Sequence, residues 1–455
     1  MNFISIREMI NFGIISLLLF SCKKQSGEND YLPTFQTQSI FPLQNEHVHG
    51  ATVVELPNGN VLAAWFQGSG ERWADDVKIM GARLTKGDTL WSESFLMADK
   101  PDFPDINPMM FLDMRNRLWL MWYAVLANQW ETSLPIYRIS ENYQDEGAPK
   151  WNWQDIILVK PGDKTERGIL REDKFVIGAK KQLADYEAYF NKEILPQFPD
   201  SLKEIYHSGW KSYKAKIDSL TKGRNMIRKG RIMKGGIVKD TLLGYPISRR
   251  IGWQTKNKPL ILGERMIVPF YSDGLDCSIF AITDNWGESW QYSNPILGGA
   301  GIQATIAIKK DSSIVAYLRD NGPPPQRMQR TESKDRGLTW SIPKDTNLPN
   351  SGAGFDMVTL NNGEWLIVFN DSEYNRHNLV VAITDDEGKS WKWKRYLEND
   401  TRQKQATRYH YPAVVQGNDR RIHVVYSYHR NDQNGNPNKT IKYAAFTVNW
   451  VKGAF

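Results

Sequence analysis

The chain has 455 residues and a formal net charge of +7, and it is 41% hydrophobic and 12% aromatic. Its 34 glycines, 22 prolines and 17 tryptophans are typical of short aromatic-rich strands separated by turns, so the composition excludes a helical bundle. The length exceeds the usual size of one domain, but all-β proteins built from repeated units reach it as a single body. We therefore expect an all-β protein.

Residues 1–21 have the pattern of an export signal. Arg7 precedes an apolar run at 9–20 that is too short to span a bilayer as a helix. The run ends in LFSC, which resembles the bacterial lipobox, in which Cys22 would receive the lipid. The alternative is an ordinary signal peptide followed by a chance cysteine. We expect an exported lipoprotein, in the periplasm or on the outer-membrane surface, with residues 22–35 as a flexible tether to the membrane.

Six segments between residues 36 and 455 share one plan, in which a polar turn joins two apolar strands. They cover residues 49–66, 107–123, 258–273, 303–320, 356–371 and 411–428. Six such pairs predict a six-bladed β-propeller. The first residue of each pair is polar, which predicts a central pit suited to a sugar, or else a water-filled channel without chemistry. These rim residues are His49, Asn107, Lys258, Gln303, Asp356 and Tyr411.

A second repeat supports the same architecture. The octets TDNWGESW (283–290), SKDRGLTW (333–340) and TDDEGKSW (384–391) fit one pattern, Ser/Thr-x-Asp/Asn-x-Gly-x-Ser/Thr-Trp. The acidic or amide side chain can accept backbone N–H groups across a hairpin, and the glycine can supply a left-handed turn. The tryptophan packs the turn against its own sheet. The octet is therefore a structural motif, and three copies at spacings of 50 and 51 residues predict an architecture of repeated blades.

Residues 160–245 interrupt the repeats with helical spacing of apolar residues. Residues 160–240 contain 19 basic and 11 acidic side chains, an excess of +8. A basic helical insertion could bind an acidic polymer or an anionic membrane surface, or its charges could simply form a solvated face. Basic residues interleaved with aromatic ones, as in a nucleic-acid site, are missing from the sequence, so we expect no nucleic acid as a partner.

These repeats resemble those of the sialidase superfamily of Asp-box (BNR-repeat) propellers, over about residues 40–450 apart from the insertion. The resemblance implies three arginines that clamp a sugar carboxylate, an aspartate general acid/base, and a tyrosine nucleophile polarised by a glutamate. It places two of the arginines at Arg319 and Arg376 and the nucleophile at Tyr411. The acid/base would be Asp75 or Asp76, in the stretch GERWADDVKIM.

Two positions depart from that pattern. His49 stands where the resemblance implies the first arginine, and Gln303 stands where it implies the glutamate. An amide can orient a phenol by hydrogen bonding, but it cannot take up a proton as a carboxylate does. Substitutes lie nearby in the sequence, since His47 shares a strand face with His49, Arg72 precedes the candidate acids, and Asp356 could also supply acid/base chemistry.

Three functions fit these residues. The first is an exo-acting glycoside hydrolase for an acidic or highly hydroxylated sugar. The second is a glycan-binding lipoprotein without catalysis, and the third is a uronate polysaccharide lyase in which a histidine or Tyr411 removes a proton and Arg319 or Arg376 neutralises the carboxylate. For each we expect a monomer that needs neither a cofactor nor a metal, although His47 and His49 could in principle ligate one.

Overall fold

The computed structural model describes residues 32–162, 173–221, 231–233, 236–238, 247–402 and 404–453. The predicted signal peptide, Cys22 and most of the predicted tether lie outside these residues. Within the ranges just given, no helix is both long enough and apolar enough to cross a membrane.

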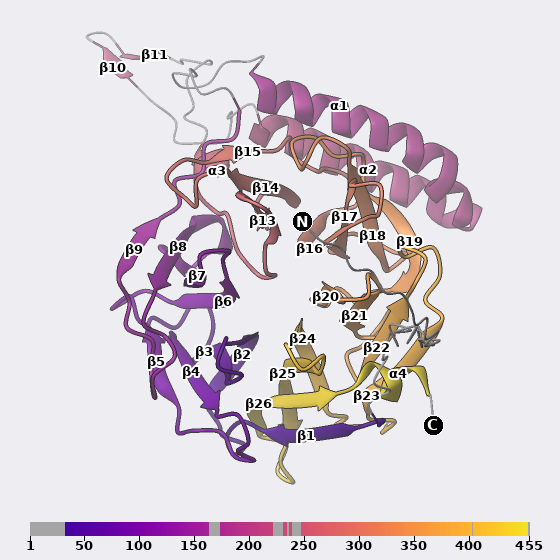
Figure 1. Ribbon diagram of the computed structural model, residues 1–455. Helices are drawn as coiled ribbons and strands as arrows, with labels where there is room; N and C mark the ends of the chain where they lie inside the picture. The colour runs from indigo at the N-terminus through magenta and orange to yellow at the C-terminus, as the bar shows by residue number, and fades with distance from the viewer. Residues whose placement is uncertain are drawn as a thin grey trace, which may run out of the picture. The chain divides into compact units, whose positions relative to one another are not determined.

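Six four-stranded antiparallel sheets stand around a common centre and confirm the predicted six-bladed propeller (Figure 1). The first three blades are β2 (His47–Glu55), β3 (Val61–Gly68), β4 (Lys78–Leu84) and β5 (Phe95–Ala98); β6 (Asp105–Leu112), β7 (Leu118–Val125), β8 (Ser133–Ser140) and β9 (Trp153–Ile156); and β12 (Leu260–Leu262), β13 (Arg265–Ser272), β14 (Cys277–Thr283) and β15 (Gln291–Tyr292).

The other three blades complete the ring in chain order, except that the last blade takes its fourth strand from the N-terminal end. They are β16 (Gly301–Ile308), β17 (Ile314–Asp320), β18 (Arg327–Ser333) and β19 (Lys344–Pro349); β20 (Asp356–Thr359), β21 (Trp365–Phe369), β22 (Asn378–Thr384) and β23 (Trp393–Asn399); and β24 (Arg408–Gln416), β25 (Ile422–Asn431), β26 (Pro437–Phe446) and β1 (Phe35–Ser39).

The core lies between neighbouring blades. Middle strands such as β7 (LWLMWYAV) are buried along their whole length, because another sheet covers each of their faces. This explains their nearly continuous apolar sequence, which differs from the alternation of a strand with one wet face. Trp65, for example, packs with Val425 and Tyr443 between the first and last blades.

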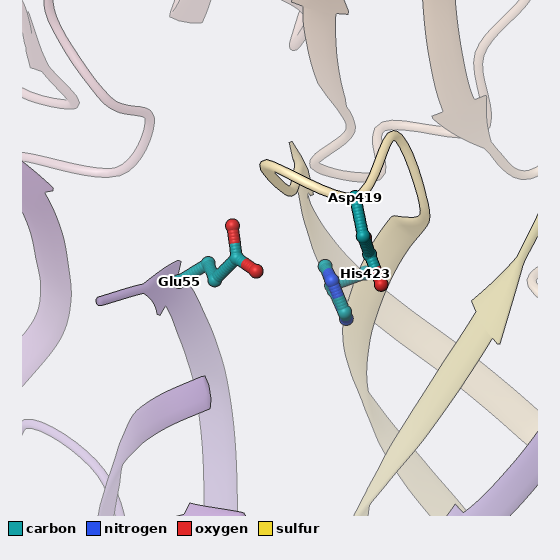
Figure 2. Close-up of side chains that lie close together, drawn as sticks. All are labelled: Glu55, Asp419 and His423. Atoms are coloured by element: carbon teal, nitrogen blue, oxygen red, sulfur yellow. The ribbon is translucent and has the colours of Figure 1, made fainter. Parts of the chain in front are cut away.

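The ring closes through β1, which pairs antiparallel with β26 from Phe35 opposite Phe446 to Ser39 opposite Lys442. The first and last blades also meet at the far end of their inner strands. There Glu55, at the end of β2, lies beside Asp419 and His423 of the last blade (Figure 2). The sequence pattern gave no sign of the closing strand.

The three octets form the turns between the third and fourth strands of blades 3, 4 and 5. The Oδ1 atoms of Asn285, Asp335 and Asp386 each accept the backbone N–H four residues later, at 2.8–2.9 Å. The octet glycines have φ values of +80° to +93°, the left-handed region that glycine adopts without a steric cost. The predicted structural role of the octets is confirmed.

The predicted helical insertion is also present. It contains α1 (Lys174–Tyr189), the π-helix η2 (Phe190–Ile194), the 3-10 helix η3 (Leu195–Gln197), α2 (Asp200–Thr221), a two-stranded sheet of β10 (Arg231–Met233) and β11 (Gly236–Val238), and α3 (Ile247–Arg250). A short 3-10 helix η1 (Trp130–Thr132) and the C-terminal α4 (Val448–Lys452) complete the described elements.

Helices α1 and α2 pack against blades 3 and 4 at the top of the view in Figure 1. Asp173 accepts the N–H of Val176 at the start of α1 and forms a fully buried ion pair with Arg249 of α3 at 2.8 Å. From α2, Tyr213 donates to the carbonyl of Asp276 and Lys216 pairs with its carboxylate at 3.0 Å. The insertion therefore holds the β13–β14 loop, residues 273–276, in place.

Candidate active site

Four inner strands carry the same irregularity near the centre of the ring. The pairing register shifts by an extra residue in β2, β6, β16 and β24, and the residue at each bulge has a left-handed backbone with φ between +47° and +62°. Such bulges re-aim side chains and are common beside active sites. The four bulge residues are Gly50, Asn107, Gln303 and Tyr411.

Tyr411 is the centre of a hydrogen-bonded group from two blades. Its hydroxyl oxygen accepts from Arg319 Nη1 at 2.9 Å and from Gln303 Nε2 at 3.2 Å. Arg319 Nη1 also donates to Gln303 Oε1 at 3.2 Å. Because a guanidinium can only donate, it fixes the amide with its oxygen toward Arg319 and its NH₂ group toward the phenol. The Tyr411 oxygen thus receives two donors, and its own O–H is free to face a ligand.

The group continues around the ring through two further tyrosines that the sequence reading did not include. Gln303 Nε2 donates to Tyr271 Oη at 3.1 Å, and Asn107 Nδ2 donates to Tyr271 Oη at 3.3 Å and to Tyr123 Oη at 3.2 Å. Burial raises the pKa of Tyr123 and of Tyr271, so both stay neutral phenols. They form a polar but uncharged floor beside Tyr411.

Arg376 brings a second guanidinium to the same place. Its Nη2 donates to the carbonyl of Gly352 at 2.7 Å, and its Nη1 donates to His410 Nδ1 at 2.9 Å. Burial lowers the pKa of Arg376, an ionised Tyr411 would raise it, and the positive charge of Arg319 lowers it further, so the three groups share one electrostatic environment. The structure therefore brings together both predicted arginines and the predicted tyrosine.

Histidines lie on the side of this group where the resemblance implied the first arginine. The ring of His49 stacks on that of Tyr411 with centroids 4.4 Å apart, and its Nδ1 lies 2.9 Å from Ser427 Oγ. His410 and His429 lie 5.4 and 5.5 Å from His49, centroid to centroid. Burial is the largest cause that lowers the pKa of each of the three, so they are neutral imidazoles at physiological pH.

Asp273 is a half-buried carboxyl beside this group, and the sequence analysis did not include it. It follows β13 and lies close to Arg319, whose positive charge acts on it, while its own charge acts on Tyr271 and Tyr123. Burial raises the pKa of Asp273 to about 6, against the opposing effect of Arg319 and a hydrogen bond from Gln254. A carboxyl with such a pKa can carry a proton to a leaving group near neutral pH.

The loop after β3 places its carboxylates differently from the sequence-based prediction. Asp76 accepts the backbone N–H and the hydroxyl of Ser69 at 2.8–3.1 Å, which makes it a support of the loop itself. Asp75 is exposed and accepts from Asn128 Nδ2 at 2.9 Å. Glu71, in contrast, reaches the histidine group and contributes to the electrostatic environment of Arg376.

His47 and Arg72 flank this loop. His47 lies with its Nε2 3.1 Å from Glu71 Oε1 and its Nδ1 2.6 Å from Lys439 Nζ. The guanidinium of Arg72 lies over the rings of Trp130 and Trp73, at 5.0 and 5.3 Å from their centroids. Trp73 is 62% exposed, so this pair presents an aromatic surface to solvent.

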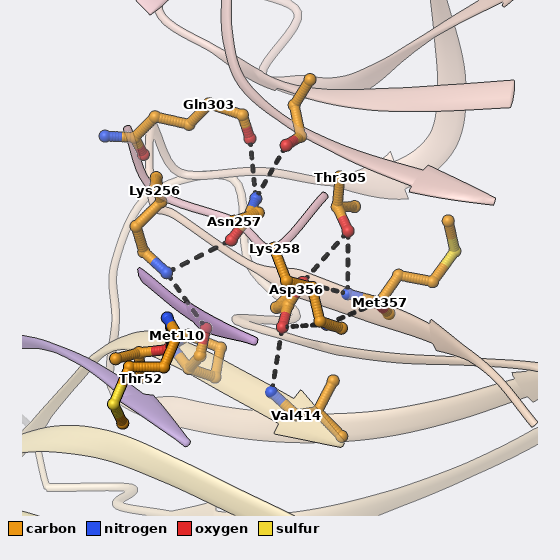
Figure 3. A network of polar contacts seen from close by, with 12 residues as sticks. Thr52, Met110, Lys256, Asn257, Lys258, Gln303, Thr305, Asp356, Met357 and Val414 are labelled. Atoms are coloured by element: carbon orange, nitrogen blue, oxygen red, sulfur yellow. Dashed lines mark hydrogen bonds and ion pairs between the residues drawn. The ribbon is translucent and has the colours of Figure 1, made fainter. Parts of the chain in front are cut away.

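Two of the predicted rim residues, Lys258 and Asp356, form an ion pair between blades. The carboxylate of Asp356 pairs with Lys258 Nζ at 2.6 Å and accepts from Thr305 Oγ1 and from the N–H of Val414 (Figure 3). It also accepts the N–H of Met357. All its acceptor positions are occupied by these donors, so we do not place Asp356 among the acid/base candidates.

The segment that precedes β12 lies beside this ion pair and donates hydrogen bonds to the inner strands of three blades (Figure 3). Thr255 donates to the carbonyl of Asn107, Asn257 donates to that of Gln303, and Lys256 donates to that of Pro412. Lys256 Nζ also lies 5.5 Å from the centroid of the Tyr411 ring, and burial lowers the pKa of Lys256 to about 8. Residues 254–258 thus join the inner strands beneath Tyr411, and the signal for this role in the sequence was the unbroken polar run QTKNK.

The chain belongs to the family of the BNR repeat-like domain, which matches residues 59–167 and 249–424, on both sides of the helical insertion. It is a sialidase-like propeller of that family. Its fold is similar to a protein of unknown function from Dyadobacter fermentans (TM-score 0.59, 12% identity), with 91% of this chain and 99% of the other aligned.

Two glycan-acting enzymes share the fold at low identity. The NanB sialidase of Streptococcus pneumoniae aligns with a TM-score of 0.53 and 14% identity over 91% of this chain and 71% of its own. The α-L-arabinofuranosidase Arb93A of Fusarium graminearum aligns with 0.52 and 11% over 92% and 99%. No curated protein sequence gives a significant match. The family is thus that of the BNR repeat-like domain, and the fold is one that these two enzymes share.

Proposed function

We propose that the protein is an exo-acting glycoside hydrolase for an acidic sugar, bound at the centre of the propeller. The observation that carries the proposal is the shared pit of Arg319, Arg376 and Tyr411, in which Arg319 touches the tyrosine oxygen directly. Two guanidinium groups beside one reactive oxygen suit a sugar whose carboxylate lies next to the bond that breaks. Arg319 Nε has no partner among the described residues and is free to donate to that carboxylate.

Tyr411 would serve as the nucleophile or as the group that stabilises positive charge at the anomeric carbon. A neutral phenol suits this role, because a carboxylate nucleophile would be repelled by the substrate carboxylate. Arg319 and Gln303 donate to its oxygen and so stabilise negative charge there. Gln303 positions the phenol but takes up no proton, so the proton must leave by another route.

Proton transfer would fall to Asp273 and Glu71, which approach the pit from blades 3 and 1. Asp273 is the better general acid, because its raised pKa leaves part of it protonated near neutral pH. Glu71, held by His47, would act as the partner base. Two carboxyl groups in different environments are the usual means by which glycosidases divide acid and base roles.

One observation favours a second candidate, a lyase for uronic-acid glycans. The neutral ring of His49 lies directly on Tyr411, and the residue that would polarise the tyrosine is an amide. A neutral imidazole can remove the proton beside a carboxylate that the arginines neutralise, and the phenol can give a proton to the glycosidic oxygen that leaves as its C–O bond breaks. This reaction forms a double bond and needs no glutamate.

One experiment separates these functions. The purified protein is incubated with sialylated, uronic-acid and neutral oligosaccharides, and both released sugar and ultraviolet absorbance are followed. Hydrolysis releases a terminal acidic sugar without a new absorbance, whereas a lyase gives an unsaturated product that absorbs. Saturable binding of a glycan without either product would identify a binding protein and overturn both enzyme proposals.

A further inference from the structure

A second group of chemically competent side chains lies at the other end of the propeller from the pit. Glu55 ends β2, whose first residue is His47, so the two are separated by about 26 Å at about 3.3 Å per residue. Asp419 lies in the β24–β25 turn, and His423 is the second residue of β25. One potential ligand atom from each of Glu55, Asp419 and His423 lies within 4.8 Å of the other two (Figure 2).

His423 provides an independent sign that this group binds something. The side chain is only 5% exposed, and its Nε2 has no hydrogen-bond partner among the described residues. Nδ1 lies 2.7 Å from the hydroxyl of Tyr443. When Nδ1 donates its proton to this oxygen, Nε2 is left unprotonated and has a free lone pair. Metal-binding histidines are commonly held in this way, with one ring nitrogen donating to a neighbouring group and the other binding the metal. A buried nitrogen without a partner is costly unless a ligand satisfies it.

We propose that Glu55, Asp419 and His423 form a site for a divalent transition metal of the Zn²⁺ class, which ties blade 1 to blade 6. One imidazole nitrogen and two carboxylate oxygens suit such an ion, which takes three protein ligands and leaves a fourth position for water. Ca²⁺ fits poorly, because it requires six or more oxygen ligands and does not favour a nitrogen ligand.

The surrounding groups are compatible with this assignment. Burial and the charge of Asp419 raise the pKa of Glu55, while burial lowers the pKa of His423 to about 4. A cation between these groups would relieve the repulsion of the two carboxylates. The basic groups that face them are Lys86 and Arg421, and Arg421 Nε lies 3.9 Å from Asp419 Oδ2. Arg421 is 43% exposed, so it can move aside toward solvent.

The proposed ion lies where the ring closes, since blade 6 holds both chain ends of the propeller through β1 and β26. Glu55 already accepts the N–H of Asn418 across this junction, at 2.5 Å. Metal ligands 364 positions apart in sequence would join the first and last blades directly. We therefore expect the ion to stabilise the folded ring and not to take part in the chemistry of the pit.

The test is zinc titration of the EDTA-treated protein by calorimetry, with the melting temperature measured in parallel. We expect one ion per chain at this site and a melting temperature that rises with zinc concentration. The variant D419N removes a mostly exposed ligand with little effect on folding, and E55Q removes a second; each should weaken binding at least about tenfold. Co²⁺ in place of Zn²⁺ should give the visible absorption of a low-symmetry site with nitrogen and oxygen ligands.

The matched control is D311N. Asp311 occupies the corresponding turn of blade 4, and its Oδ1 accepts the N–H two residues later at 2.9 Å, as Asp419 Oδ1 does. This variant should bind zinc as the wild type does. The proposal is overturned if the protein binds no zinc, or if D419N and E55Q bind it with wild-type affinity, which would place the ion elsewhere, for example among the histidines of the pit.

Discussion

Asp273 gives the proposed hydrolase a pH dependence that can be measured. Its pKa of about 6 is set chiefly by burial, and the positive charge of Arg319 opposes the rise. A general acid works in its protonated form, so activity is present below this pKa and falls as pH rises through it. The protonated fraction of Asp273 falls about tenfold from about pH 5 to about pH 7, so kcat/KM, which reports the pKa of the free enzyme, should fall roughly tenfold between them.

Two substitutions test this reasoning in the same assay, kcat/KM measured from about pH 5 to about pH 8 on the acidic oligosaccharide that the protein cleaves. Asp273→Asn should lower kcat/KM by about 10²- to 10⁴-fold and remove the fall above about pH 6, because the amide cannot donate an acid proton. Arg319→Ala should lower the rate and move the fall to higher pH, because it removes the charge that lowers the Asp273 pKa. A wild-type profile in Asp273→Asn, or a fall at lower pH in Arg319→Ala, would refute the assignment.

Three further substitutions probe the site and the fold. Arg376→Ala should reduce kcat/KM for an acidic sugar by about 30-fold or more, since truncating one side of a desolvated ion pair costs about 2–5 kcal/mol, and the loss should be small for a neutral substrate. Asp386→Ala should lower the free energy of urea unfolding by about 1 kcal/mol by removing turn hydrogen bonds, whereas Asp386→Asn should cost less because Asn285 fills that place in blade 3. Asp173→Ala should cost about 3–5 kcal/mol by leaving Arg249 buried without its carboxylate partner, and an unfolding midpoint equal to that of the wild type would contradict this.

The sequence predicted the propeller because each blade repeats local chemistry. The octet turns at 283–290, 333–340 and 384–391 need an acceptor, a left-handed glycine and an apolar anchor at fixed spacing, and these are visible without knowledge of the fold. The closing strand 35–39 could not be seen, because it has no partner near it in sequence and pairs with residues more than 400 positions away.

The sequence predicted site residues only where they belong to the repeated strand pairs. Gln303 and Tyr411 lie at bulges of inner strands and Arg319 near the end of β17, and the three meet near the centre of the ring. Asp273 was missed because one short strand, β12, and the segment before it replace the regular inner strand of blade 3. Its signal was its place at the end of the second strand of its blade, which is also the place of Arg319 in blade 4.

Acidic side chains that the sequence pattern cannot distinguish make different contacts in the folded protein. Asp76 and Glu71 lie in one loop. Asp76 accepts hydrogen bonds from Ser69 of the same loop, whereas Glu71 contacts His47. Asp356 has the polar rim position that suggested catalysis, but partners from neighbouring blades occupy it completely. Local sequence cannot show which acceptors remain free.

The most direct test of the proposed function is a proton NMR time course of the protein with acidic oligosaccharides, run beside the variant Tyr411→Phe. The variant keeps the aromatic ring on which His49 stacks but loses the oxygen that Arg319 and Gln303 hold. We predict that the wild type releases the terminal acidic sugar and that Tyr411→Phe is slower by at least about a hundredfold. Equal rates for both proteins, or no release from any acidic glycan, would contradict an acidic-sugar hydrolase centred on Tyr411.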